Sequence, residues 1–240
     1  MQNNDMPKVS VIIPVYGVEK YIERCARSLF EQTLDCIEYI FVDDCSPDKS
    51  IEILERVADE YRSRLVEEQK LVRIERMSKN SGLPAVRKYG IQFCTAEYII
   101  HCDSDDWIEM DMYRIMYEEA KRNDADIVMC GYKATDGVKV FKECYHQQTN
   151  KAKLLSSLLI LHESWSVWNK MCKRSLYDSD IVYPTLAMGE DMVLTIQMVL
   201  NAQRIAVVNK ALYNYFYNPN SITKVQSECS RYKHWKDSAE

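Results

Sequence analysis

The stretch EYIIHCDSDDW, from Glu97 to Trp107, is an apolar run that ends abruptly in three carboxylates. Its first half has the composition of a short buried β-strand, and Asp103, Asp105 and Asp106 follow directly after that strand. Carboxylates held close together repel one another, so such a cluster is costly unless a metal ion, an arginine or water neutralises it. The stretch therefore predicts either a cation site or a solvated acidic turn, and spacing alone favours neither.

The spacing of the carboxylates also limits which cation they can bind. Asp103 and Asp105 are separated by one residue, so both can direct a hard oxygen donor at one divalent ion. Mg²⁺ or Mn²⁺ suits such an oxygen-rich set, completed by the phosphates of a substrate. An EF-hand is set aside, because the sixth position counted from Asp103 is Ile108 rather than glycine and the twelfth is Arg114 rather than glutamate.

The segments before this stretch alternate between strand and helix patterns. Strands are expected at Val9–Val15, Glu38–Val42 and Leu71–Ile74, and helices at 21–32, at 46–65 with Ser46 as N-cap and Pro47 at the first position, and between Gly82 and Phe93. This alternation predicts an α/β fold with a Rossmann-like, mostly parallel central sheet flanked by helices. In such a sheet the functional loops lie at the carboxyl ends of the strands, where the acidic cluster is found.

The alternation becomes less regular after Trp107. Helices are expected at 111–122, at 151–161 and from Glu190 onward, and strands at 127–132, 138–144, 205–208 and 212–217. No internal repeat, linker or low-complexity tract separates the two halves, so residues 1–240 are expected to form a single domain. Its second half is expected to be smaller in regular structure and to differ from the first in task.

Composition restricts the class of protein further. Nine cysteines, an odd number without a C-x-x-C pair, are typical of reduced thiols in the cytosol. A net charge of −5 without a basic cluster gives nucleic acid no electrostatic basis for binding. The longest apolar run, 154–161, is far below the roughly 20 residues of a spanning helix, and residues 1–9 lack the pattern of a signal peptide. We therefore expect a soluble, cytoplasmic chain.

Polar residues follow the other strands of the first half as well. They form three groups: Pro14-Val15-Tyr16, Asp43-Asp44, and Asn80-Ser81-Gly82 with Arg87 about one helical turn later. Tyr16 can stack on a base, Asp44 can accept an N–H of uracil, and Arg87 can donate to a base or diphosphate. Together they predict a nucleotide pocket, although each residue alone is more often an ordinary strand-end residue. Neither a G-x-G-x-x-G motif nor a Walker A loop is present, which leaves diphosphate binding to the metal.

Five motifs within residues 8–222 occur in a characteristic order and spacing. They are VSVIIPVYGVEKYIERCARSLFEQT, IEYIFVDDCSPDKS, NSGLPAVRKYGI, YIIHCDSDDW and GEDMVL. In this order they resemble the motifs of family 2 glycosyltransferases with the GT-A fold. The resemblance implies a nucleotide-sugar donor, a divalent metal on Asp103-x-Asp105, and a single displacement that inverts the anomeric carbon.

The resemblance also implies roles for individual residues. Donor-nucleotide contacts are implied for seven of them: Pro14, Val15, Tyr16, Asp44, Asn80, Arg87 and Asp103. Asp105 becomes the main metal ligand, shared with Asp103, and Asp191 becomes the general base that takes a proton from the acceptor. Asp191 follows Gly189 at an expected helix start, however, where negative charge is favourable for electrostatic reasons alone.

The acceptor is expected to lie beside the base. Trp168, Asn169 and Lys170 precede it, and Glu190 adjoins it. A tryptophan can stack on a sugar face and Asn or Lys can bind hydroxyls, although core packing is the more frequent use of tryptophan. The family pattern is broken at Pro84, where Ser is common, at Lys88, where Asn is common, and at Cys45, where Gly is usual.

The sequence thus predicts an inverting, metal-dependent glycosyltransferase that uses a UDP-sugar and a glycan or lipid-linked acceptor in surface polysaccharide synthesis. Residues 8–110 would bind the nucleotide-sugar and 111–222 the acceptor, with 223–240 as a tail; docking to the inner membrane face would need a segment outside this chain. One alternative is a sugar nucleotidyltransferase, which usually has a Gly-rich basic loop that VIIPVYGVEKY does not match. The other is a non-catalytic nucleotide-sugar binding protein, which should lack the metal acids or the base.

Overall fold

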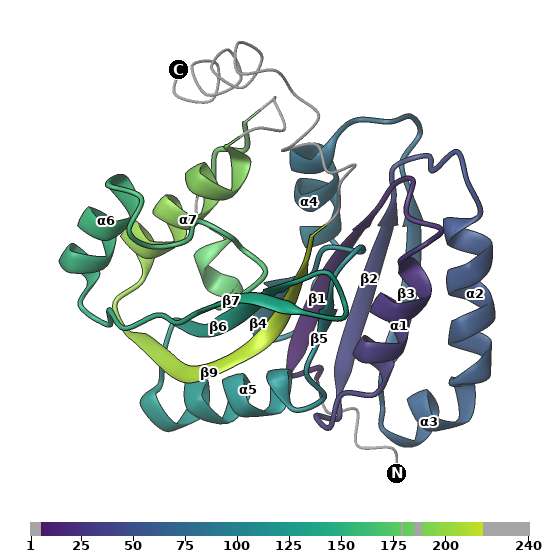
Figure 1. Cartoon of the computed structure of the whole chain (residues 1–240), viewed down its shortest axis with the longest axis horizontal. Helices are drawn as coiled ribbons and strands as arrows, with labels where there is room; N and C mark the ends of the chain where they lie inside the picture. The colour runs from purple at the N-terminus through teal and green to yellow at the C-terminus, as the bar shows by residue number, and fades with distance from the viewer. Residues whose placement is uncertain (1–5, 179, 185–188, 218–240) are drawn as a thin grey trace.

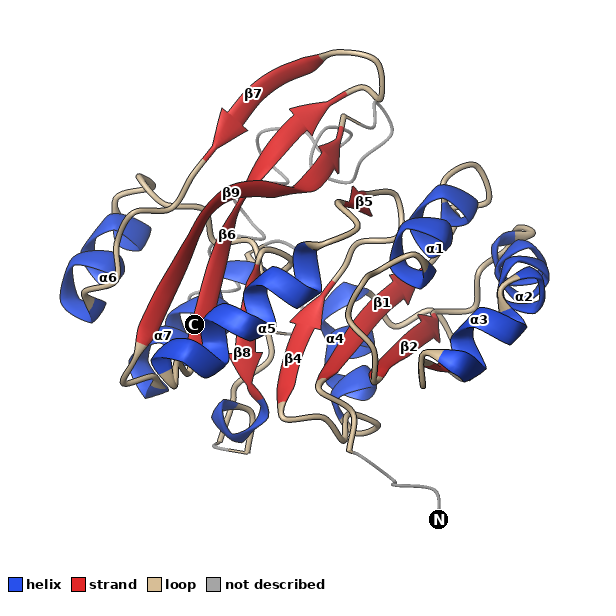
Figure 2. Cartoon of the chain, turned by 90° about the horizontal axis from the view of Figure 1, so that it is seen from below, coloured by secondary structure: helices blue, strands red, loops and turns tan. Residues whose placement is uncertain are grey.

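A computed structural model describes residues 6–178, 180–184 and 189–217 of the chain (Figure 1). Within these residues a nine-stranded sheet has the order β3-β2-β1-β4-β8-β6-β9-β5, and β7 pairs with β6 outside this path. Helices cover both of its faces (Figure 2). The predicted α/β architecture with a mostly parallel central sheet is confirmed.

The first half of the chain builds one end of the sheet from parallel strands. These are β1 (Val9–Val15), β2 (Ile37–Asp43), β3 (Leu71–Arg76) and β4 (Tyr98–His101), with Val9 opposite both Ile37 and Tyr98. Between them run α1 (Ile22–Phe30), α2 (Ser50–Glu60), α3 (Arg62–Glu67) and α4 (Leu83–Ile91). Because the four strands point the same way, their carboxyl ends and the loops that follow share one edge.

The second half adds mixed pairing. Its elements are β5 (Trp107–Ile108), α5 (Met112–Asn123), β6 (Ile127–Thr135), β7 (Val140–Cys144), α6 (Lys151–Leu159), β8 (Lys170–Lys173), a 3₁₀ turn (Arg174–Leu176), α7 (Glu190–Asn201) and β9 (Ile205–Phe216). Strand β8 runs antiparallel between β4 and β6, so it joins the two halves into one sheet. The predicted hairpin across Asp136-Gly137 is confirmed as β6–β7.

Alternating residues of the strands supply the cores on the two faces. On β1, Val11 and Ile13 pack with α1, α2 and α5, whereas Ile12 packs on the opposite face with Val86 of α4. Helices α6 and α7 pack against β6 in a third core that is separate from the other two. Helix α4 approaches β1 closely at Gly90, where a Cβ would lie 2.7 Å from Cγ2 of Ile12. This glycine therefore helps to set the distance between the sheet and α4, the helix that carries Arg87.

Two local expectations are wrong. Helix α2 begins at Ser50 rather than at Pro47, because the Asp48 carboxylate accepts N–H groups from both Ser50 and Glu19 and holds residues 46–49 in a turn. The expected helix 46–65 is also two helices that meet at Tyr61. The two closing strands expected at 205–208 and 212–217 form one strand, β9, whose pairing with β6 shifts register around Gly131.

Candidate functional site

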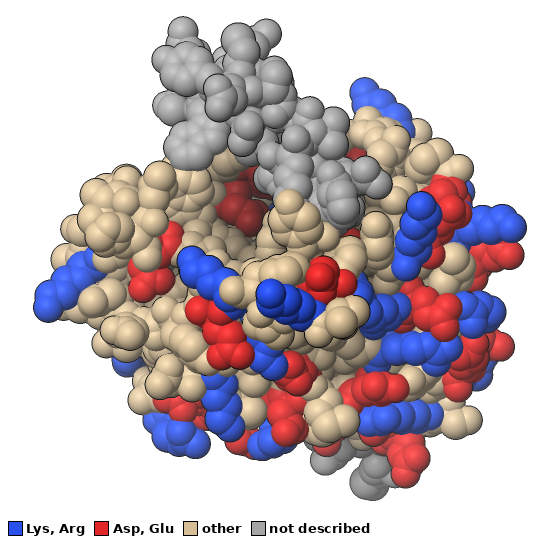
Figure 3. All heavy atoms as spheres, in the orientation of Figure 1, with Lys and Arg blue, Asp and Glu red and all other residues tan. Residues whose placement is uncertain are grey.

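The carboxyl end of the parallel strands faces the start of α7. Figure 3 shows acidic side chains at the bottom of a hollow on this face of the molecule. Three carboxyl groups meet here around one guanidinium, which belongs to Arg87 of α4. Asp103 comes from the loop after β4, and Glu190 and Asp191 come from the first turn of α7. The structure thus brings the predicted donor-side acid and the predicted base to one place, although 88 positions separate them in sequence.

Arg87 is the central cation of the site, and its side chain is 2 % exposed. Its Nη2 donates to Oδ1 of Asp103 at 3.0 Å and lies 3.4 Å from Oδ1 of Asp191. Burial lowers the pKa of Arg87, but the charges of Asp103, Asp191 and Glu190 outweigh it and raise the pKa above its ordinary value. Within the described residues, Nε and Nη1 have no hydrogen-bond partner. The guanidinium therefore stays charged and keeps donors for a further group.

Glu190 and Asp191 open α7, whose N-cap Gly189 adopts φ 90°; Glu190 is buried, and the Asp191 side chain is 25 % exposed. Burial raises the pKa of Glu190 to about 8, the charge of Asp191 adds to this, and Arg87 opposes it. Burial raises the pKa of Asp191 as well, against the opposing charge of Arg87. The two acids titrate together, so the pair holds a proton near neutral pH. The contribution of Glu190 to stability is therefore complete below its ordinary pKa of 4.5 and is lost as the pH rises through about 8.

Asp106 has a structural role rather than a role in the site. It is 1 % exposed, and it accepts the hydroxyl of Tyr213 at 2.6 Å and the N–H of Phe216 at 2.7 Å. The Tyr213 hydroxyl in turn accepts the N–H of Asp103 at 3.1 Å. Burial first and the charge of Asp105 second raise the pKa of Asp106 well above its ordinary range. Asp106 therefore fastens the acidic loop to β9.

We expect Tyr213→Phe to lower the free energy of unfolding by about 1–3 kcal/mol, because Oδ2 of the buried Asp106 and the backbone N–H of Asp103 both lose the hydroxyl that they share. Tyr113→Phe is the matched control. Tyr113 is equally buried, but its hydroxyl has no hydrogen-bond partner within the described residues. Urea unfolding of the two variants measures the difference, and equal stabilities would contradict the anchoring role of Tyr213.

The predicted metal ligands lie on this anchored loop. Within the described residues, no group of three or more His, Cys, Asp or Glu side chains is placed to hold a metal ion. An ion on Asp103 and Asp105 would therefore need oxygens from a bound substrate, which is how Mg²⁺ and Mn²⁺ are often held beside diphosphates. The donor set fits such an ion in type, because both side chains are hard oxygen donors.

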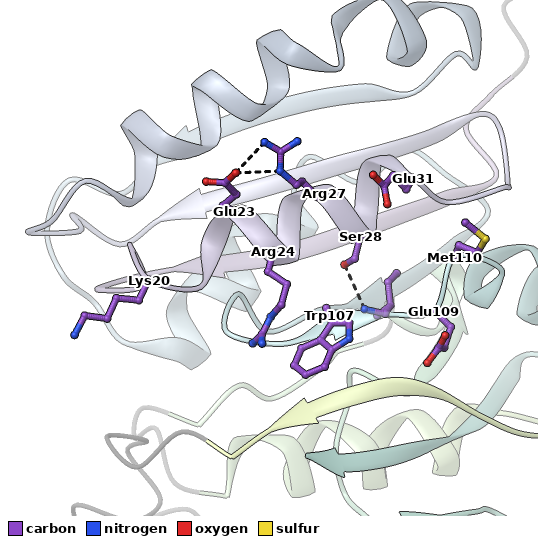
Figure 4. Close-up of a pocket in the computed structure, with 10 residues that line it drawn as sticks. Lys20, Glu23, Arg24, Arg27, Ser28, Glu31, Trp107, Glu109 and Met110 are labelled. Carbon is purple, nitrogen blue, oxygen red and sulfur yellow. Dashed lines mark hydrogen bonds and ion pairs between the residues drawn. The ribbon is translucent and has the colours of Figure 1, made fainter. Parts of the chain in front are cut away.

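Arg24 of α1, which sequence reasoning missed, supports the same loop from outside. Its Nη2 donates to the backbone oxygen of Asp105 at 2.9 Å, and its guanidinium lies 3.7 Å from the ring centroid of Trp107 and 4.5 Å from that of Phe216. Arg24 and Trp107 belong to the wall of an open groove of about 760 Å³ between α1 and β5 (Figure 4). This groove does not include the carboxyl cluster. No motif signal identified Arg24, since Asp105 and Trp107 lie about 80 positions away in the sequence and Phe216 lies farther still.

The predicted nucleotide residues occupy different positions around the hollow. Asp44 is buried, and its carboxylate accepts the N–H groups of Ser81 at 2.7 Å and Gly82 at 2.9 Å, which fixes the loop before α4. Tyr16 is 50 % exposed, so its ring is accessible to a ligand. Pro14 is half-buried and Asn80 is exposed.

One nucleotide residue needs correction. The side chain of Val15 is fully buried in the core under α1, so it does not line a base. Its backbone oxygen accepts the N–H of Asp44, which ties the two strand-end loops together. Cys45 after Asp44 has φ 58°, the left-handed conformation for which glycine is usual at this position.

The predicted acceptor residues Trp168, Asn169, Lys170 and Glu190 also need correction, because all four are buried. Trp168 stacks on Tyr213 with a centroid distance of 4.2 Å and on Tyr215 at 5.8 Å, so its ring does not offer a face to a sugar. Asn169 has no exposed surface, and the three donors of Lys170 are all bound to protein oxygens. Lys170 is buried because β8 pairs between β4 and β6, and Trp168 is buried because two tyrosines of β9 cover it; residue types alone reveal neither.

Comparison with known proteins identifies the class. The sequence profile described as Glycosyl transferase family 2 matches residues 10–185, and the chain belongs to this family. It is 32 % identical over 230 residues to the uncharacterized glycosyltransferase EpsJ of Bacillus subtilis, covering 92 % of this chain and 64 % of EpsJ. It is 30 % identical over 215 residues to the poly(ribitol-phosphate) beta-N-acetylglucosaminyltransferase TarS of Staphylococcus aureus, covering 88 % of this chain and 35 % of TarS. The chain thus spans less than two thirds of these relatives.

Solved structures agree with the family. The crystal structure of S. aureus TarS residues 1–349 in complex with UDP-GlcNAc superimposes with a TM-score of 0.77 at 27 % identity, over 92 % of this chain and 61 % of that one. A mannosyltransferase from Pyrobaculum calidifontis in complex with GDP-Man and Mn²⁺ gives a TM-score of 0.65 at 16 % identity, over 91 % of this chain and 59 % of that one, and shares the fold. The predicted GT-A fold is confirmed. Within the described residues, no helix is long and apolar enough to cross a membrane.

Proposed function

We propose that this chain transfers a sugar from a UDP-sugar to a hydroxyl of a glycan or lipid-linked acceptor, with inversion, in the assembly of a surface polysaccharide. The single observation that carries the proposal is the meeting of Asp103 and Asp191 at the buried guanidinium of Arg87. A donor-side acid and an acceptor-side acid within one ion-pair cluster are the two groups that a one-step displacement needs.

The choice of a UDP-sugar is supported by the relatives. TarS, whose crystal structures include complexes with UDP-GlcNAc and with UDP, matches most of this chain in sequence and in fold. TarS is named as a poly(ribitol-phosphate) beta-N-acetylglucosaminyltransferase, which supports a polymeric acceptor. A lipid-linked acceptor would place the reaction at a membrane surface.

In the proposed reaction, Asp191 takes the proton of the acceptor hydroxyl while the hydroxyl oxygen attacks the anomeric carbon. The bond between the anomeric carbon and the diphosphate breaks on the opposite side. Oδ1 of Asp191 suits this task, because within the described residues it is buried and has no hydrogen-bond partner. The raised pKa of Asp191 makes its carboxylate a stronger base, which favours transfer of the proton from the acceptor hydroxyl. Arg87, whose Nε and Nη1 have no hydrogen-bond partner among the described residues, stabilises negative charge beside Asp191.

Asp103 and Asp105 would hold a Mn²⁺ or Mg²⁺ ion in this proposal. When bound, such an ion supplies Lewis-acid stabilisation of the departing diphosphate. The chain's own contribution is to keep both carboxylates on a loop that Tyr213 and Arg24 fix from two sides.

The decisive experiment is to incubate the protein and Mn²⁺ with a panel of nucleotide sugars and to measure nucleotide diphosphate release. Release from a UDP-sugar, stimulated by a glycan acceptor, is the expected result. Pyrophosphate release from UTP and a sugar phosphate would instead favour a sugar nucleotidyltransferase. Binding of a UDP-sugar without any release would favour a non-catalytic binding protein.

Asp44→Asn is expected to weaken UDP binding by about 1–3 kcal/mol, the value of a hydrogen bond to a charged group. Its carboxylate is proposed to accept the uracil N–H while it holds the Ser81 and Gly82 amides. Calorimetry with UDP measures the loss. Asp59→Asn, at an exposed residue of α2 that pairs with Arg62, is the control, and equal affinity of the two variants and the wild type would remove the uracil contact.

A further inference from the structure

Lys170 is a buried ammonium at the centre of the sheet that the proposed chemistry leaves unexplained. It is 3 % exposed on β8. Its Nζ donates to the backbone oxygens of Ser164 at 2.8 Å and Ser166 at 2.7 Å, and to Oδ1 of Asn169 at 3.0 Å. An ammonium has three donors, so none remains for a sugar hydroxyl.

These three bonds shape residues 164–169 into a turn, here called the 164–169 turn. Oδ1 of Asn169 also accepts the hydroxyl of Ser166 at 3.0 Å, and Nδ2 meets Nε2 of His146 at 2.7 Å. Nδ1 of His146 in turn meets Oε2 of Glu163 at 2.5 Å, so each polar atom of this chain of contacts has a partner. The turn is thus held on its inner side by a continuous set of hydrogen bonds.

The 164–169 turn is also fastened to the helix that carries the base candidate. The hydroxyl of Thr195 on α7 donates to the backbone oxygen of Trp165 at 2.5 Å. Thr195 lies one turn after Asp191, and the backbone amide of Val167 lowers the pKa of the Asp191 carboxyl. A change in the 164–169 turn is therefore expected to alter the position of Asp191 through the contacts of Thr195 and Val167.

Two cations act on Asp191. It is faced by Arg87 from α4, Asp103 from the loop after β4, Glu190 from α7 and Lys170 from β8. Arg87 is shared between Asp103 and Asp191. In the protein without a metal ion and with Glu190 protonated, the carboxylates of Asp103 and Asp191 are balanced only when Lys170 is counted together with Arg87.

We propose that Lys170 is a positioning residue for Asp191: it shapes the 164–169 turn against the start of α7 and supplies the second buried positive charge that keeps the Asp191 carboxylate ionised. Burial lowers the pKa of Lys170 to about 8, and the charge of Asp191 opposes this. Cys172, Glu163 and Cys130 also face the ammonium and favour its charge. The proposal rests on the proposed function, in that Asp191 is taken as the base.

The first test compares Lys170→Met with Lys173→Met, which removes a lysine of the same strand that pairs with Asp124 and Asp126 away from the site. UDP release is measured from pH 5 to 9. The acid limb is the low-pH part of the rate profile, where the rate falls because Asp191 becomes protonated. We expect this limb to move to higher pH in Lys170→Met, so that on the limb the turnover, relative to the plateau of the same variant, is about tenfold lower than in the wild type. Lys173→Met should match the wild type, and Lys170→Arg, which keeps the charge, should keep the limb in place. An unmoved limb in Lys170→Met would overturn the proposal.

The second test needs no turnover and serves if Lys170→Met does not fold. The ¹⁵N signal of the Lys170 ammonium is titrated in the wild type and in Asp191→Asn, in which Lys170 is intact. Coupling between the two groups is reciprocal, so Asp191→Asn should move the Lys170 midpoint to lower pH. An identical midpoint in both proteins would overturn the proposal. A wild-type protein that releases nothing from any nucleotide sugar would instead refute the proposed function, and this titration would still decide the role of Lys170.

Discussion

Asp191→Asn is expected to bind UDP and metal nearly as the wild type does while transferring sugar about 10²–10⁴-fold more slowly, the usual contribution of a general base. An amide keeps the size of the side chain but does not accept a proton at its oxygen under these conditions. Arg87 keeps its ion pair with Asp103 in the variant, so the donor side of the cluster remains intact. Calorimetry with UDP, melting temperature and the transfer rate are measured on the same preparation.

The alternative explanation of Asp191 gives the opposite result. If its carboxylate only favours the N-terminus of α7, the variant should lose about 0.3–1 kcal/mol of stability and keep its rate. Glu190→Gln is the matched control on the same helical turn. Because Glu190 has its pKa raised to about 8, it is largely protonated at neutral pH, and a neutral amide in its place should slow transfer less than Asp191→Asn does. Near wild-type transfer by Asp191→Asn would refute the assignment, and Glu190 would then be the candidate base.

Asp105→Ala is expected to abolish metal-dependent binding of UDP, since it removes the main anionic ligand proposed between the protein and the diphosphate. The backbone of residue 105 remains bound to Arg24, so the loop should keep its position. Calorimetry with UDP in the presence of Mn²⁺, repeated with a chelator, measures the effect. The variant with Mn²⁺ should resemble the wild type with the chelator.

The choice of control matters for this variant. Asp106 is unsuitable despite its adjacent position, because it is buried under Tyr213 and its loss would disturb the fold. Asp111 is a better control. Its side chain is 41 % exposed and pairs with Arg114 outside the carboxyl cluster, so Asp111→Ala should leave UDP binding unchanged. Unchanged affinity in Asp105→Ala would remove the metal assignment.

Several features could be predicted from the sequence because local patterns determine them. Apolar runs such as Val9–Val15 and Tyr98–Ile100 specify strands, and helical periodicity specifies the segments between them, so the parallel half of the sheet follows. The rule that ligands meet at the carboxyl ends of parallel strands then placed Asp44 and Asp103 on the same edge. The motif order within residues 8–222 pointed to the family that the profile match at 10–185 shows.

The acidic stretch shows that local sequence patterns do not predict which side chains become buried by distant residues. Asp105 and Asp106 are neighbours of the same residue type, but Asp106 is buried by the hydroxyl of Tyr213, which lies 107 positions later. The burial of Trp168 could not be predicted from the sequence either, since two tyrosines of β9 cover it. No property of either residue alone reveals a partner so distant in the chain.

The sequence by itself therefore determined the elements, the strand-end loops and the family, all of which depend on short-range periodicity and motif spacing. Only the tertiary structure decided which polar groups face the hollow. Arg87, Asp103 and Asp191 meet because Gly90 lets α4 pack closely on β1 and because β8 joins the two halves of the sheet. Burial then changes the chemistry of this cluster, since removing water raises the pKa values of Glu190 and Asp191 and strengthens the interactions between the charges around them.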